Sequence, residues 1–130
     1  MSERIKAQAA KLIKRVGPDH PITVGPAGTH VVVKVGTRVI AESDDALLLR
    51  EASYPPVVYV PREDLDESVV RPSATTSYCP YKGDAGYVSI DTGEQQVTDA
   101  GWTYQRPYED VAAIAGHVAF YPDRVTVKAG

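Results

Sequence analysis

The chain opens with apolar residues at a helical spacing. They recur every three or four positions with charged residues between them: Ile5, Ala9, Leu12, Ile13 and Val16. One apolar stripe at this period is typical of an amphipathic helix. Gly17 followed by Pro18 is a common way for a helix to end. The pattern therefore predicts an N-terminal amphipathic helix in residues 1–17, ahead of the main domain.

After Pro21 the apolar residues come in short runs that are separated by turn residues. Runs of this length, rich in valine and isoleucine, are typical of β-strands. Gly36-Thr37 and Thr92-Gly93 each separate two runs and predict tight hairpin turns. The predicted strands are residues 22–24, 30–35, 38–41, 46–51, 57–60, 87–91, 94–98, 117–121 and 125–127.

The remaining segments complete the predicted architecture. Residues 61–67 and 108–115 each predict a short helical turn, and residues 71–86, with two prolines and two glycines, predict irregular chain. The last two strands predict a hairpin through Pro122-Asp123. Eight or nine short strands without alternating helices favour a mainly β, antiparallel domain over residues 18–130, either a sandwich or an open barrel.

Composition and charge exclude several classes of protein. The chain has 130 residues and a net charge of −3, which suits one globular domain. Its single cysteine, Cys79, excludes an internal disulfide and a zinc site of paired cysteines, and we expect no metal and no cofactor. After residue 40, acidic residues outnumber basic ones fifteen to seven, which argues against a nucleic-acid partner. Without a membrane-length apolar run or a signal-peptide core, the sequence predicts a cytoplasmic protein without membrane contact.

The aromatic residues are unevenly distributed along the chain. Eight tyrosines accompany one tryptophan and one phenylalanine, and all ten rings lie between Tyr54 and Tyr121. Most of these tyrosines lie near prolines, at expected strand ends, where a ring can pack while its hydroxyl reaches a partner. We therefore expect any cleft in the second part of the chain.

Three segments carry residues that suit chemistry. Lys82 follows Cys79 by three positions, and a cation near a thiol favours the reactive thiolate; the alternative is a small buried apolar cysteine. Arg62 could clamp a carboxylate or phosphate, or it could pair locally with a neighbouring acid. Trp102 and Tyr104 share one face of an extended segment, where they form either a stacking wall or an anchor of the core.

Several stretches together resemble a known bacterial family, the domain-of-unknown-function 427 family, which is also labelled nucleotidyltransferase-like. They are PDHPIT (18–23), VIAESDDALLLREASYPPVVYVPREDL (39–65), TTSYCPYKGDAGYVSI (75–90), AGWTY (100–104) and IAGHVAFYPDRVTV (114–127). The resemblance implies a small β-tent-like domain, in which two antiparallel sheets leave a cleft between them. It implies no activity. The sequence also lacks the phosphate-binding loop that a nucleotidyltransferase would pair with its carboxylates.

We expect the residues from these blocks to converge on one cleft: Glu51, Tyr59, Arg62, Cys79, Lys82, Trp102 and Tyr104. The first hypothesis is a small-molecule binding domain, with aromatic walls and with Arg62 and Lys82 attracting an anionic group. The second is an enzyme that uses Cys79 with Lys82 in nucleophilic, redox or nucleotidyltransferase-like chemistry. The third is a protein interaction module that docks through its outer strand or N-terminal helix, and a homo-oligomer is compatible with it.

Overall fold

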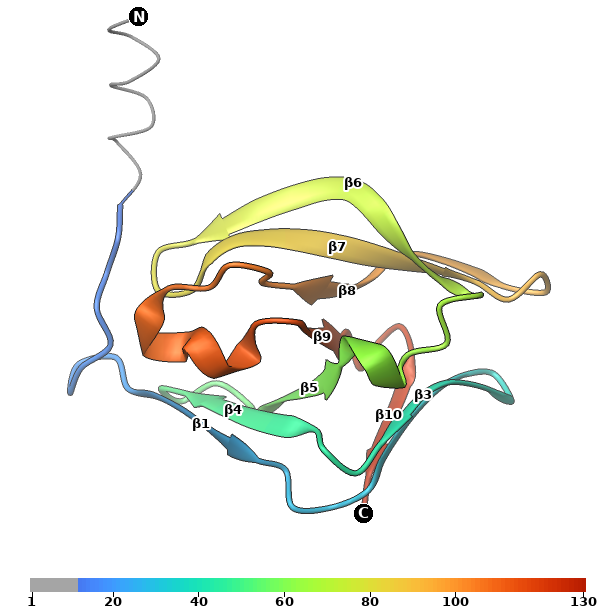
Figure 1. Ribbon diagram of the computed structural model, residues 1–130, viewed down its shortest axis with the longest axis horizontal. Coiled ribbons are helices and arrows are strands. Elements are labelled where there is room, and N and C mark those ends of the chain that lie inside the picture. The colour runs from blue at the N-terminus through green and yellow to red at the C-terminus, as the bar shows by residue number, and fades with distance from the viewer. Residues whose placement is uncertain (1–11) are drawn as a thin grey trace, which may run out of the picture.

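The computed structural model describes residues 12–130, which form two antiparallel β-sheets (Figure 1). The large sheet has seven strands in the order β1-β4-β5-β9-β8-β7-β6, and the small sheet has three in the order β10-β2-β3. The strands are β1 (Ile22–Pro26), β2 (Val31–Val35), β3 (Arg38–Ser43), β4 (Leu47–Glu51), β5 (Val57–Pro61), β6 (Val70–Cys79), β7 (Gly83–Asp91), β8 (Gln96–Thr103), β9 (His117–Phe120) and β10 (Thr126–Ala129). The expectation of a mainly β protein with two antiparallel sheets is confirmed.

Two predicted hairpins form where the sequence places them. Val35 pairs with Arg38 across the two-residue turn between β2 and β3, and Gly36 there has a φ of 60°. This left-handed conformation suits glycine because it has no Cβ. Asp91 pairs with Gln96 at the end of the β7–β8 hairpin, around Thr92-Gly93.

The expectation of irregular chain over residues 71–86 is wrong. These residues form most of β6, the longest strand, and the start of β7. β6 lies at the edge of the large sheet and pairs only with β7. An edge strand tolerates Pro72, which lacks an N–H, and its register shifts between Pro72 and Thr76. The prolines and glycines therefore mark a bulge and a turn within a hairpin.

The predicted final hairpin is also wrong. β9 pairs with β5 and β8 in the large sheet, whereas β10 pairs with β2 in the small sheet. The turn after β9 therefore carries the chain from one sheet to the other.

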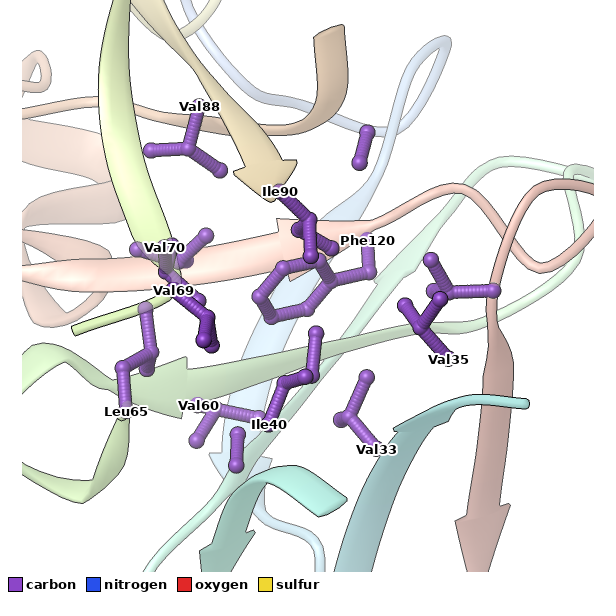
Figure 2. Packing of buried hydrophobic residues seen from close by; sticks show 14 of the residues in the cluster. Val33, Val35, Ile40, Val60, Leu65, Val69, Val70, Val88, Ile90 and Phe120 are labelled. Atoms are coloured by element: carbon purple, nitrogen blue, oxygen red, sulfur yellow. The ribbon is translucent and has the colours of Figure 1, made fainter. Parts of the chain in front are cut away.

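The two faces of the large sheet have separate cores. In β5, Val60 packs in the core that the large sheet shares with the small one, and Tyr59 packs on the opposite face. Figure 2 shows the shared core, where Val33 and Ile40 of the small sheet meet Val60 and Phe120 of the large one. The candidate site lies on the other face.

Short 3₁₀ turns take the place of both predicted helical turns. They are η1 (Arg62–Asp64) and η2 (Glu109–Ile114). In Figure 1 the large sheet curves from β6 and β7 to β4 and β1, and η2 lies between these two ends. Val111 and Ile114 of η2 are buried against the second core. Among residues 12–130, no helix is long and apolar enough to cross a membrane.

The predicted N-terminal helix falls mainly on residues 1–11, which lie outside the described residues. Its described part, residues 12–16, is not helical, so the prediction is wrong there. Backbone amides of this segment donate hydrogen bonds to the Pro80 carbonyl oxygen (2.9 Å) and to the Asp110 carboxylate (2.9 Å). These long-range bonds use donors that a helix would use internally.

Candidate functional site

A pocket opens on the face of the large sheet that η2 partly covers. Alternate residues of a strand point to the same face, so pairs such as Trp102 and Tyr104 project together. The pocket has a volume of about 210 Å³. We call it the tyrosine pocket, and it is lined by Leu49, Glu51, Val57, Tyr59, Lys82, Tyr87, Trp102, Tyr104 and Tyr121.

One end of the tyrosine pocket holds an ion pair. The Lys82 ammonium donates to Glu51 Oε1 at 2.5 Å, and the second oxygen of Glu51 lies 2.7 Å from His20 Nε2. The side chains of Lys82 and Glu51 are only 9% and 17% exposed. The imidazole ring of His20 stacks on Tyr81 at a centroid distance of 3.9 Å. This stacking fixes the ring that supports Glu51.

The ion pair sets the charge state of Glu51. Burial alone would raise the pKa of Glu51, but the hydrogen bonds with Lys82 and His20 outweigh burial and hold that pKa below its usual value. Glu51 is therefore ionised at neutral pH, and its charge balances that of Lys82. This end of the pocket is polar without a net charge from the pair.

The wall of the pocket is aromatic. Trp102 Nε1 donates to the Tyr59 hydroxyl at 3.2 Å, and the two rings meet edge to face at 6.4 Å. The ring of Tyr121 also packs against Trp102, with ring centroids 4.6 Å apart. Burial raises the pKa of Tyr59 to about 12, so its hydroxyl keeps its proton at neutral pH. Trp102 thus packs within the wall and also faces the pocket.

Tyr104 contributes a hydroxyl group to the lining of the tyrosine pocket. It is 7% exposed, yet its hydroxyl makes no hydrogen bond to any residue in the range 12–130. Burial also raises the pKa of this hydroxyl, so it stays protonated at neutral pH. Among the described residues, no buried side-chain nitrogen or oxygen lacks a hydrogen-bond partner, so the Tyr104 hydroxyl oxygen is in contact with solvent. The hydroxyl is therefore available to a bound molecule.

Cys79 lies beside the pocket rather than in its lining. It ends β6, is half-buried against the second core, and has its Sγ 3.8 Å from the Lys82 ammonium nitrogen. The contact joins the two residues that the sequence singles out for thiol chemistry. Lys82 lies closer to Glu51 than to the thiol, so its charge is already balanced.

Arg62 does not join the other candidates. The structure places it in η1, where it lines a different pocket. Of the other candidates, Cys79 lies beside the tyrosine pocket, and the pocket is lined by Glu51, Tyr59, Lys82, Trp102 and Tyr104. Sequence reasoning missed Tyr87, Tyr121 and His20. The tyrosine excess pointed to this region, but only strand pairing shows which rings share a face. Nothing in the spacing of His20 and Glu51 indicates their contact.

The chain is similar to a known protein family. The family model described as "Domain of unknown function (DUF427)" matches residues 23–129. The search among curated proteins found no significant match.

Within residues 12–130, no group of three or more histidine, cysteine, aspartate or glutamate side chains could hold a metal ion.

Proposed function

The chain belongs to the domain-of-unknown-function 427 family, and we propose that it binds a small uncharged molecule in the tyrosine pocket. The molecule would combine a flat apolar part with a hydrogen-bond acceptor such as a carbonyl oxygen. The two antiparallel sheets are compatible with the β-tent-like fold that the resemblance implies, although here the pocket lies on one face of the large sheet.

Size limits the ligand. The pocket measures about 210 Å³, below the roughly 300–1,000 Å³ of sites for drug-sized molecules. Its aromatic wall favours a flat ligand, because rings stack well at an offset or edge to face. A molecule built on a single ring fits both the volume and the wall.

Charge balance argues against an anionic ligand. The sequence suggested that Arg62 and Lys82 together attract an anion, but Arg62 lines another pocket and Lys82 is neutralised by Glu51. A charged ligand would lose its hydration at this site and find no free counter-charge from the pair. An uncharged ligand avoids this penalty.

The observation that carries the proposal is the Tyr104 hydroxyl. It is a protonated donor in an almost fully buried residue, and it has no partner among residues 12–130. Tyr59 adds a second protonated hydroxyl to the same lining. Donors that converge on one pocket favour a ligand with an acceptor, because the acceptor can form a hydrogen bond with them.

Four one-ring probes test this specificity. Benzamide is neutral and carries a carbonyl acceptor, toluene lacks the acceptor, benzoate is an anion and benzylammonium is a cation. The intrinsic fluorescence of Trp102, the single tryptophan, reports binding directly because its ring lines the pocket. We expect the Trp102 signal to respond most strongly to benzamide. Equal responses to toluene and benzamide, or none to any probe, would contradict the proposal.

A second candidate function is a reaction at Cys79. The contact of 3.8 Å between its thiol and the Lys82 ammonium favours it, because a nearby cation stabilises the thiolate. The test is the rate of alkylation by iodoacetamide as a function of pH, in the wild type and in Lys82→Met. A catalytic thiol reacts faster than free cysteine near neutral pH and slows when Lys82 is removed. A rate equal to that of free cysteine, unchanged in Lys82→Met, excludes this function.

A further inference from the structure

The pocket that contains Arg62 lies between η1 and the edge strand β6. It has a volume of about 260 Å³. Its lining residues are Arg62, Leu65, Glu67, Val70, Arg71, Pro72 and Val88. Leu65, Val70 and Val88 belong to the core shared by the two sheets, and Figure 2 shows all three on its left side, with Val70 between the other two. The pocket therefore opens on the face of the large sheet opposite the tyrosine pocket.

The Arg62 guanidinium has no partner in the described part of the chain. The side chain is half-buried, and it makes no hydrogen bond or ion pair to any residue in the range 12–130. The local ion pair that the sequence allows, with Glu63 or Asp64, does not form there. Asp64 instead accepts a hydrogen bond from Ser43 at 2.6 Å. The guanidinium nitrogens are therefore in contact with solvent and available to a bound anion.

The second cation of the pocket is Arg71. One of its nitrogen atoms lies 3.4 Å from the Ser68 carbonyl oxygen, and the residue is exposed. Glu67, also exposed, brings one negative charge to the lining. Two positive charges and one negative charge suit a ligand with a single negative charge.

The deeper part of the pocket is apolar. Leu65, Val70 and Val88 are 8%, 7% and 2% exposed and have no polar side-chain atoms. A ligand that fills this part loses contact with water over its own apolar surface, which favours binding. The pocket thus combines a cationic rim with an apolar floor.

We propose that this pocket is a second binding site, for a small molecule that joins one carboxylate to an apolar body. The planar guanidinium of Arg62 presents parallel N–H donors that match the two oxygen atoms of a carboxylate. The apolar body of the ligand packs on Leu65 and Val88. The site differs from the tyrosine pocket in charge, and the two share no lining residue.

The test compares benzoate with benzamide, which have the same ring but differ in charge. Titration calorimetry measures affinity, and backbone amide NMR shifts locate each probe. We expect benzoate to shift the amides of Leu65 and Val70, and to bind at least about tenfold more weakly to Arg62→Gln. Arg62→Lys keeps the charge but not the two parallel donors, so its loss should be intermediate. Glu67→Gln should bind benzoate about twofold more tightly, because it removes the repulsive charge.

Arg50→Gln is the matched control. Arg50 is an exposed arginine of β4 outside both pockets, so its loss makes the same change in net charge. Unfolding temperatures and NMR spectra confirm that each variant is folded. The proposal is overturned if benzoate does not bind, if Arg62→Gln and Arg50→Gln weaken it equally, or if its shifts fall around Trp102. None of these outcomes depends on whether benzamide occupies the tyrosine pocket.

Discussion

Replacing Lys82 with methionine should destabilise the fold, because the largely buried carboxyl group of Glu51 would be left with only His20 as a partner. Removing one member of a buried ion pair typically costs about 3–5 kcal/mol. Glu51 retains the hydrogen bond with His20 and is 17% exposed, so we expect the lower end, about 3 kcal/mol. Methionine fills most of the volume of the lysine stem, which limits any loss from packing.

The double variant separates charge from packing. Glu51→Leu combined with Lys82→Met removes both charges and leaves two apolar side chains. Replacement of a buried pair by apolar residues is often close to neutral. We therefore expect the double variant to be more stable than Lys82→Met alone, despite carrying one more substitution.

Urea unfolding at pH 7 and at acid pH provides the assay. The folded-state pKa of Glu51 lies below its usual value, so the stabilisation by the pair is present above the unfolded pKa. It is lost as the pH falls through the folded-state pKa. The difference between wild type and Lys82→Met should therefore shrink in acid. A Lys82→Met cost below about 1 kcal/mol at pH 7, or a double variant that is less stable than Lys82→Met, would refute this reasoning.

Three further predictions concern other parts of the fold. Gly101→Ala should lower the free energy of unfolding in urea by about 1–3 kcal/mol, because the new Cβ would lie 2.4 Å from a backbone oxygen of β9. The control is Gly25→Ala, because a Cβ at Gly25 would have no atom within 4 Å. His30 contacts carboxylates through both ring nitrogens, at 2.6 and 2.7 Å, and these bonds raise its pKa. Its stabilisation is complete below the unfolded pKa and is lost as the pH rises through the folded value, which NMR titration of the ring can locate. Asp110→Asn should speed trypsin cleavage after Arg15, because it removes a salt bridge of 2.7 Å, and unchanged cleavage would contradict this.

Much of the fold is readable from the sequence because strands and tight turns leave local signals. The two-residue turn at Gly36 and the runs around it predict β2 and β3 with nearly correct bounds. β6 was not predicted because this edge strand carries exposed polar residues and Pro72, which are typical of a loop. The β9–β10 hairpin failed for another reason. Local pattern does not show which sheet a strand joins, and β10 pairs with β2 far away in sequence.

The candidate site was predictable in part. Trp102 and Tyr104 follow from the period of a strand, and Glu51 and Lys82 lie in the stretches that resemble the family. The contact between Glu51 and Lys82 could not be predicted from the sequence, because it depends on how the β6–β7 turn packs against β4. The sequence also did not show that the Arg62 guanidinium has no partner among residues 12–130. The N-terminal helix within residues 1–11 and the homo-oligomer stay predictions.

The most direct test of the central claim is the affinity of benzamide for Tyr104→Phe relative to wild type. The substitution removes only the hydroxyl that lacks a partner among residues 12–130. Tyr54→Phe, at a tyrosine that is 64% exposed and outside the pocket, is the control. We predict that Tyr104→Phe weakens benzamide binding about two- to tenfold, while Tyr54→Phe and the binding of toluene are unchanged. Equal benzamide affinity in wild type and Tyr104→Phe would contradict the account.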